Sequence, residues 1–352
     1  MILRRIGVPH VTESISTLSG DIVISNADSN DCDDAIEDLS DWHLEFLLIS
    51  VAVCLIGALL VNPLIIFIIL LKNKFRQETR YLLLANLMLS DLVFLCLNSC
   101  VSISNGAHWH MPMLLCDFFI AALTICYCSA ILTITLMAID TFLAVSLPLR
   151  YISLMPPSRT IKLLIVIWVV ASVYPIFLLV VILVVESYPE MNHQSCLLPL
   201  ALDSKTLGNG LVISIHIFLV SGALVCLAVI IYCYVMLYYN TKRSGIWDNL
   251  YSRARVTLLI HTTLFFLYFA PGLFFAIELM INKKNRLDDR TRVWLSSVNS
   301  EVFMMLPRML CPYLYGLRYR DIAKRIKRSF LVKQHSVRSM NAWYISGHGD
   351  SQ

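Results

Sequence analysis

The sequence predicts an all-α membrane protein: a seven-transmembrane-helix bundle followed by a short amphipathic eighth helix. The first reason is composition, because 58% of the 352 residues are hydrophobic and only 15% are charged. In soluble domains, about 45–50% of the residues are apolar and about 25% are charged. The second reason is that seven apolar segments each reach the roughly 20 residues that a membrane-spanning helix needs. They are Phe46–Leu71, Tyr81–Ser104, Met113–Ile139, Leu163–Val185, Leu207–Leu237, Val256–Ile281 and Val293–Leu317.

The third reason is how lysine and arginine are distributed around these segments. Of the 28 basic residues, 19 fall on one side, 8 fall on the other and Arg308 lies within the seventh segment. The positive-inside rule places the richer side in the cytoplasm and the N-terminus outside the cell. Arg4 and Arg5 are followed by no sustained apolar run, so we expect no signal peptide. No dense basic domain with interleaved aromatic residues is present, so nucleic acid is not an expected partner.

Four regions follow from this layout. Residues 1–43 are rich in aspartate and glutamate and are expected to form a disordered extracellular tail. Residues 44–317 form the predicted transmembrane domain. In residues 318–331, Ile322, Ile326 and Phe330 recur every four residues among basic side chains, which predicts an amphipathic helix on the membrane surface. Residues 332–352 are expected to be a cytoplasmic tail.

The third apolar segment is the one around which we organise the chain. Its 24 steps from Cys116 to Asp140 would span about 36 Å as a helix, enough to cross a bilayer. We expect the membrane helix to end near Asp140, where the apolar run stops. Eight of the 11 cysteines lie inside apolar segments and are expected to pack as small apolar residues. Cys32, Cys116 and Cys196 instead face the oxidising side.

Short motifs recur in the order and spacing of a known family. They are Leu87 with Asp91 in the second segment, Asp140-Thr141-Phe142 with Pro148 after the third, Trp168 in the fourth, Phe269 with Pro271 in the sixth, and Cys311-Pro312 with Tyr315 in the seventh. The chain from about Phe46 to Phe330 resembles rhodopsin-like (class A) G-protein-coupled receptors. Two stretches, Ser244–Trp247 and Asn299–Val302, resemble one orphan member of that family more narrowly.

The resemblance implies a receptor in the plasma membrane that senses an extracellular ligand and couples to a heterotrimeric G protein. It also implies a disulfide between Cys116 and Cys196, which would leave Cys32 free or paired between molecules. No cofactor is expected. No Cys/His/Asp cluster at ligand spacing suggests an enzyme, and no internal repeat or ring of charges suggests a transporter or channel.

Three positions depart from the family pattern where conformational switching takes place. Thr141 stands where the family has arginine, Phe269 where it has tryptophan, and Cys311 where it has asparagine. Pro271, Pro312 and Tyr315 are kept. Asp140 is expected to pair with an arginine, and Arg150, Arg253 and Arg255 are the candidates. These departures leave an alternative open: a non-signalling decoy, scaffold or partner subunit.

Charged residues within the apolar segments predict a buried polar core. Counted from the cytoplasmic ends, Asp91 lies about 15 Å deep, and Asn62 and Arg308 lie about 14 Å deep. In the family this level holds a sodium ion, but the residues expected to help bind it are replaced here. We therefore expect no metal site and an Arg308–Asp91 pair in its place. The alternative is that Arg308 extends to the cytoplasmic surface.

The ligand pocket is expected among Leu123, Thr124, Tyr127, Phe269 and Glu301. Leu123 stands where the family's amine receptors have aspartate, so a biogenic amine is disfavoured. The other positions make a mostly apolar pocket with a few polar groups. Glu301 is expected either to meet a cationic group of the ligand or to pair with Arg292 or Lys283.

Overall fold

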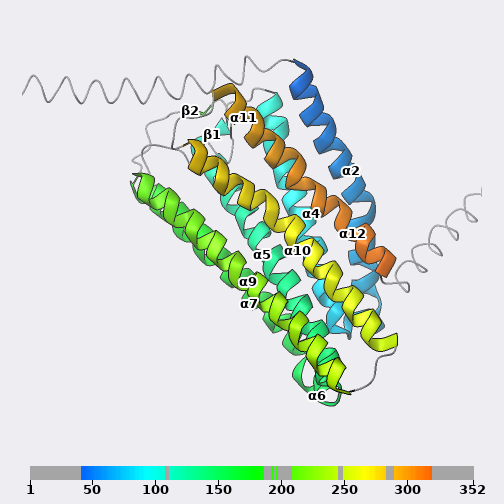
Figure 1. The fold of residues 1–352 in the computed structure, drawn as a ribbon. Helices are drawn as coiled ribbons and strands as arrows, with labels where there is room; N and C mark the ends of the chain where they lie inside the picture. The colour runs from blue at the N-terminus through cyan, green and yellow to red at the C-terminus, as the bar shows by residue number, and fades with distance from the viewer. Residues whose placement is uncertain are drawn as a thin grey trace, which may run out of the picture.

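The computed structural model describes residues 41–107, 111–185, 192–193, 196, 208–244, 249–282 and 289–318. These residues form a helical bundle with one short antiparallel pair of strands (Figure 1). The elements are α2 (Asp41–Leu71), α3 (Asn73–Arg76), α4 (Thr79–Gly106), β1 (Met111–Pro112), α5 (Met113–Ser146), α6 (Pro148–Leu154), α7 (Pro157–Val185), β2 (Asn192–His193), α9 (Gly208–Ser244), α10 (Asn249–Asn282), α11 (Asp289–Val298), η2 (Asn299–Phe303) and α12 (Met305–Arg318). We call the end with β1 and β2 the strand end and the opposite end the α6 end.

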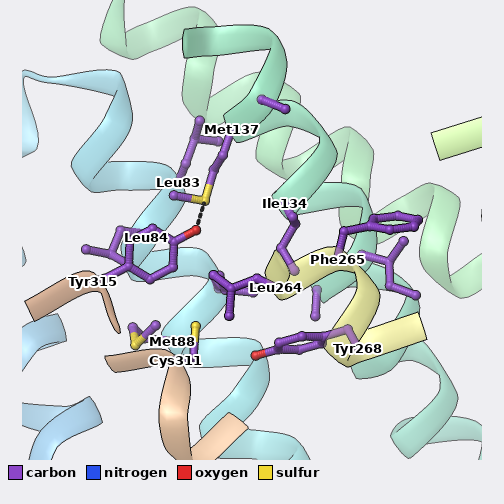
Figure 2. Packing of buried hydrophobic residues seen from close by; sticks show 14 of the residues in the cluster. Leu83, Leu84, Met88, Ile134, Met137, Leu264, Phe265, Tyr268, Cys311 and Tyr315 are labelled. Carbon is purple, nitrogen blue, oxygen red and sulfur yellow. Dashed lines mark hydrogen bonds between the residues drawn. The ribbon is translucent and has the colours of Figure 1, made fainter. Parts of the chain in front are cut away.

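Helix α5 runs through the middle of the bundle and contacts α4, α7, α9 and α10, while α2 packs against α4 and α12. Figure 2 shows the core between α4, α5, α10 and α12. Its labelled members are Leu83, Leu84, Met88, Ile134, Met137, Leu264, Phe265, Tyr268, Cys311 and Tyr315. Only 17% of the apolar stretch of α7 is buried, against 72% in α4. The outer helices therefore present apolar side chains outward, as a bundle surrounded by lipid must.

Six of the described helices are long and apolar enough to cross a membrane. They coincide with the first six predicted segments. The seventh segment forms α11, η2 and α12 in succession rather than one regular α-helix, which corrects the expectation of a single uninterrupted span. The predicted seven-helix bundle is confirmed, with its seventh span divided.

The interruption of the seventh span is a π-helical turn. The amide of Met304 donates to the carbonyl of Asn299, five residues back, which is the π-helix pattern. Pro307 follows in the first turn of α12, the part of a helix in which proline is tolerated. The turn leaves both Asn299 and Glu301 buried although they are only two residues apart.

The third span is longer than its apolar run. Helix α5 continues past Asp140 to Ser146, so the polar residues at 140 and 141 do not end it. It ends at Leu147, after which Pro148 begins α6. Proline is favoured in the first turn of a helix and disfavoured further in, so Pro148 both stops α5 and starts α6.

Polar side chains tie the central helices together. The indole nitrogen of Trp168 on α7 donates to Asn86 on α4, and the amide of Asn86 donates to Thr133 on α5, both at 2.9 Å. At the α6 end, the hydroxyl of Thr79 donates to the carbonyl of Met155 at 2.9 Å. Because buried polar groups are costly without partners, these bonds fix how the three helices sit against each other.

Three predicted features lie outside the described residues. They are the acidic tail before residue 41, including Cys32, and nearly all of the amphipathic helix and the tail that follows it. Those expectations stay predictions.

Candidate functional site

A disulfide closes the strand end. Cys116 at the start of α5 and Cys196 are bonded, with their Cα atoms 5.7 Å apart. Asn105 at the end of α4 holds Cys196 on both sides: its amide nitrogen donates to the Cys196 carbonyl and its oxygen accepts from the Cys196 N–H, both at 2.8 Å. The bridge implied by the sequence is thus formed, and it joins three segments at one end of the bundle.

The expected pocket residues lie in two neighbouring apolar clusters. Leu123 packs with Phe94, Cys126 and Met304, and Phe269 belongs to the larger core. Tyr127 packs against both clusters. The hydroxyl of Thr124 donates to the carbonyl of Ile120 in its own helix, so it is already satisfied by the backbone.

Tyr127 also reaches across to α10. Its hydroxyl donates to the backbone carbonyl of Tyr268 at 2.9 Å. A Cβ atom placed on Gly272 would lie 2.5 Å from that hydroxyl oxygen. The absence of a side chain at Gly272 is therefore what lets α5 and α10 approach so closely next to Pro271.

Glu301 faces α4 rather than the other expected pocket residues. Its Oε2 accepts from the amide of Asn98 at 3.0 Å and from the hydroxyl of Ser102 at 2.6 Å. The side chain of Arg292, one of its two expected cationic partners, lies outside the described residues, as does Lys283. In the described structure, the buried Glu301 carboxylate accepts hydrogen bonds from two neutral donors on α4.

Asp91 and Arg308 meet in the centre of the bundle. The Nε of Arg308 lies 3.9 Å from Oδ1 of Asp91, and the two side chains are 1% and 0% exposed. The guanidinium carbon lies 3.5 Å from the ring centroid of Phe94, within the range of a cation–π interaction. Arg308 also donates to the carbonyl of Met304, four residues back in the chain. Arg308 therefore stays inside the bundle instead of extending to its surface.

Tyr268 on α10 is a hydrogen-bond partner of Asp91. Its hydroxyl donates to Oδ2 at 2.6 Å, and the side chain is completely buried. Figure 2 shows this hydroxyl pointing from α10 toward Cys311 on α12. Asn62 is equally buried, but neither polar atom of its side chain has a hydrogen-bond partner in the part of the chain that the structure describes. Asp91 and Arg308 come together as expected, while Asn62 makes no hydrogen bond with them.

The α6 end contains the expected switch residues. Oδ1 of Asp140 accepts from the hydroxyl of Tyr151 on α6 at 2.8 Å. The side chain of Arg253 lies outside the described residues, so the expected pairing of Asp140 with an arginine stays a prediction. Burial, and then the Asp140 carboxylate, raise the pKa of Tyr151, which keeps this donor protonated at physiological pH. Thr141 donates to the carbonyl of Met137 at 2.9 Å, and Tyr315 donates to the sulfur of the same methionine at 3.5 Å.

The two prolines of the switch set lie inside helices, Pro271 in α10 and Pro312 in α12. The carbonyl of Pro271 accepts from the amide of Asn299 at 3.1 Å. Proline inside a helix removes one backbone hydrogen bond and favours a kink. The bond from Asn299 therefore ties the seventh span to α10 at the position where α10 bends most readily.

Comparison with known proteins decides what kind of bundle this is. Residues 61–315 match the family described as 7 transmembrane receptor (rhodopsin family). The chain belongs to this family. It is therefore a class A G-protein-coupled receptor and a multi-pass membrane protein, not an enzyme.

Individual receptors of the family are similar over part or most of the chain. Human probable G-protein coupled receptor 148 is 35% identical over 281 residues, 80% of this chain and 81% of that protein. Odorant receptor 131-2 of Danio rerio is 25% identical over 291 residues, 81% and 87% of the two chains. Rat growth hormone secretagogue receptor type 1 is 33% identical over 117 residues, 32% of each. The narrower resemblance to an orphan member, the first of these, is confirmed.

Sequence reasoning missed the partners of the polar groups. Tyr268 lies next to Phe269 in the sixth segment but carried no signal of its own. Phe94 was also missed, although it lies three residues after Asp91, on the same helix face. Asn98 and Ser102, the partners of Glu301, are four residues apart on α4. Their spacing was a usable signal, because positions four apart on a helix face the same neighbour.

Proposed function

We propose that this receptor senses an extracellular ligand at the strand end and changes, at the α6 end, a surface that a heterotrimeric G protein reads. The observation that carries the proposal is α6. Leu149 is 96% exposed and Ile152 is 81% exposed, on a helix of seven residues between two membrane spans. Positions three apart share one face of a helix, so these two side chains form an exposed apolar patch, and such patches are typical of interaction sites.

Contacts to the core support a signalling role for α6. The Tyr151–Asp140 hydrogen bond ties α6 to α5, and α5 contacts α10 and α9. A movement of α10 against α5 would therefore reach α6 through few intermediates. These contacts supply the contiguous packed route that coupling between the two ends can use.

The strand end is proposed to face the outside of the cell and the α6 end the cytoplasm, in the plasma membrane. The distribution of lysine and arginine supports this orientation, and so does the disulfide, because disulfides persist on the oxidising side. Antibody access to a tag fused at Met1 on intact cells tests it. Staining only after permeabilisation would contradict it.

The ligand is proposed to be something other than a biogenic amine. Leu123, where an amine-binding acid would stand, is buried among apolar side chains. Glu301 is the acidic residue of the expected pocket set. Its hydrogen bonds to Asn98 and Ser102 orient one carboxylate oxygen toward α4. The polar part of the ligand is proposed to meet Glu301 and the apolar part to meet Tyr127 and Phe269.

A non-signalling receptor is the second candidate, and Thr141 favours it. The hydroxyl of Thr141 is satisfied inside its own helix by Met137, so it offers no directed donor like the five N–H groups of an arginine. Thr141 is proposed to make coupling weak, and Phe269 and Cys311 to alter the same switch.

Release of Gα from Gβγ on expression in cells tests the α6 surface. We expect Leu149→Ala with Ile152→Ala to reduce signalling several-fold at equal surface expression. The matched control is Ile165→Ala with Val169→Ala, two apolar side chains on α7 that are 59% and 58% exposed. Equal effects of the two pairs would contradict the proposal, and no signal from the parent would favour the second candidate.

A further inference from the structure

Asp91 lies between two side chains that compete for it, one on α10 and one on α12. Its Oδ2 accepts from the hydroxyl of Tyr268 at 2.6 Å. Its Oδ1 lies 3.9 Å from Nε of Arg308, which is beyond the roughly 3.2 Å limit of an N–H···O hydrogen bond. Two fully buried opposite charges are thus close to each other without a direct bond.

Both ions have unused hydrogen-bonding capacity. Oδ1 of Asp91 and Nη2 of Arg308 have no hydrogen-bond partner among the described residues, although the thiol of Cys311 lies beside the carboxylate. An arginine and a carboxylate bind most strongly when two N–H groups meet two oxygens. That arrangement cannot form while Tyr268 holds one oxygen and Arg308 rests on Phe94 and the Met304 carbonyl.

The Tyr268 bond is placed where α10 can bend. Pro271 is three residues further along the helix. The backbone on either side is held by Tyr127, which donates to the Tyr268 carbonyl at 2.9 Å, and by Asn299, which donates to the Pro271 carbonyl at 3.1 Å. The side chain of Tyr268 is the tie that joins this bend to α4.

We propose that Asp91 is a partner-exchange switch. Tyr268 holds Asp91 while α10 is packed against α5 and α12, and Arg308 takes both carboxylate oxygens when α10 swings outward. Without Arg308, the outward movement would strand a buried carboxylate, which is strongly unfavourable. Arg308 therefore stabilises the open arrangement, and Tyr268 stabilises the closed one. The assignment of these arrangements to resting and signalling states rests on the proposed function, but the exchange itself does not.

The distance between the α6-end parts of α10 and α3 measures the exchange directly. Spin labels on keto amino acids introduced at the exposed residues Lys74 and Val256 avoid the native cysteines. The labelled receptor is studied in lipid nanodiscs by pulsed electron paramagnetic resonance, with no ligand or G protein. The result is therefore independent of whether the receptor couples to a G protein.

We expect Tyr268→Phe to raise the population of the longer distance about fivefold, because it removes one charge-assisted hydrogen bond and keeps the ring. Tyr174→Phe on α7 is the matched control, since the buried hydroxyl of Tyr174 has no hydrogen-bond partner in the described structure. It should change nothing. Adding Arg308→Met to Tyr268→Phe should return the distances toward those of the parent.

Two results would overturn the switch. One is a Tyr268→Phe distribution like that of Tyr174→Phe. The other is an opening by Tyr268→Phe that is the same with Arg308 and with Arg308→Met, because the tyrosine would then be a structural tie alone. If Tyr268→Phe yields no folded protein, Arg308→Met alone decides: a smaller longer-distance population supports the exchange, and an unchanged or larger one overturns it.

Discussion

At the residue scale, Arg308 is the feature that sets this bundle apart, because it is a charged side chain with 1% exposure in the middle of a membrane protein. At an effective dielectric constant near 20, opposite charges at its distance from Asp91 attract by about 4 kcal/mol. Desolvation of both ions offsets much of that attraction. Whatever the pair contributes to the net stability, removing either residue would leave the other as an uncompensated buried charge.

Asp91→Ala and Arg308→Ala are therefore each expected to destabilise the receptor by about 3–5 kcal/mol, since each strands a buried charge. Asp91→Asn combined with Arg308→Met should recover much of this loss. Thermal unfolding of the purified variants measures the coupling. The distant pair Asp91 and Asp140 serves as the additive control. Strictly additive effects of the Asp91 and Arg308 variants would show that the two do not act as a unit.

Sodium is expected to have no specific effect on this receptor, because the Arg308 guanidinium already supplies a positive charge beside Asp91. Thermal stability should be the same in sodium and potassium at fixed ionic strength. The Arg308→Met variant is the informative comparison, since it leaves the carboxylate without its cation. Clear stabilisation of the parent by sodium over potassium would contradict the Asp91–Arg308 pair.

Gly272 is a second residue whose substitution the structure forecasts. A methyl group there would meet the hydroxyl oxygen of Tyr127 at 2.5 Å, so Gly272→Ala is expected to cost about 1–3 kcal/mol through overpacking. Gly222→Ala is the control, because a Cβ at Gly222 has nothing within 4 Å, and it should be neutral or slightly stabilising. Thermal unfolding compares the two. Tyr127→Phe should relieve the Gly272→Ala defect, and equal effects at both glycines would refute the close approach.

At the scale of elements, the strand end depends on one covalent tie. The Cys116–Cys196 bond joins α5 to the β2 region, and Asn105 extends that tie to α4. The two cysteines are 80 residues apart in the sequence, so the disulfide closes a long loop. Closing a long loop restricts the unfolded chain and thereby stabilises the folded state.

Cys196→Ala is therefore expected to lower stability by about 2–4 kcal/mol and to reduce surface expression. Cys100→Ala is the matched control, since Cys100 is an exposed free cysteine on α4. Cell-surface labelling and thermal unfolding measure both effects. Indistinguishable behaviour of the two variants would mean that the bridge does not support the fold.

The elements also show what a sequence can predict here. The first six spans follow from apolar runs, because lipid forces every spanning backbone into helices. The prediction that α5 ends near Asp140 was wrong, because a polar residue does not by itself end a helix. Pro148 ends α5 instead. The π-turn at Asn299–Phe303 has no such local signal, because it depends on how the seventh span packs. The Asp91–Arg308 pair was predictable from depth, whereas Tyr268 required knowledge of the angle at which α10 faces α4.

At the scale of the whole molecule, α5 and α10 link the two ends of the bundle. The strand end is fixed by a disulfide, and the centre is held by Asp91, Tyr268 and Arg308. The α6 end exposes the apolar side chains of Leu149 and Ile152, and Thr141 stands near it where the family has an arginine. The central claim is that this arrangement still signals, weakly, through a G protein.

Guanine-nucleotide exchange on purified heterotrimeric G protein, catalysed by the receptor in nanodiscs, tests that claim most directly. We expect the parent to raise the exchange rate slightly above that of empty nanodiscs, and Thr141→Arg to raise it several-fold further by restoring directed donors at the α6 end. Thermal unfolding confirms that both proteins are folded. Exchange at the level of empty nanodiscs for both the parent and Thr141→Arg would contradict the account.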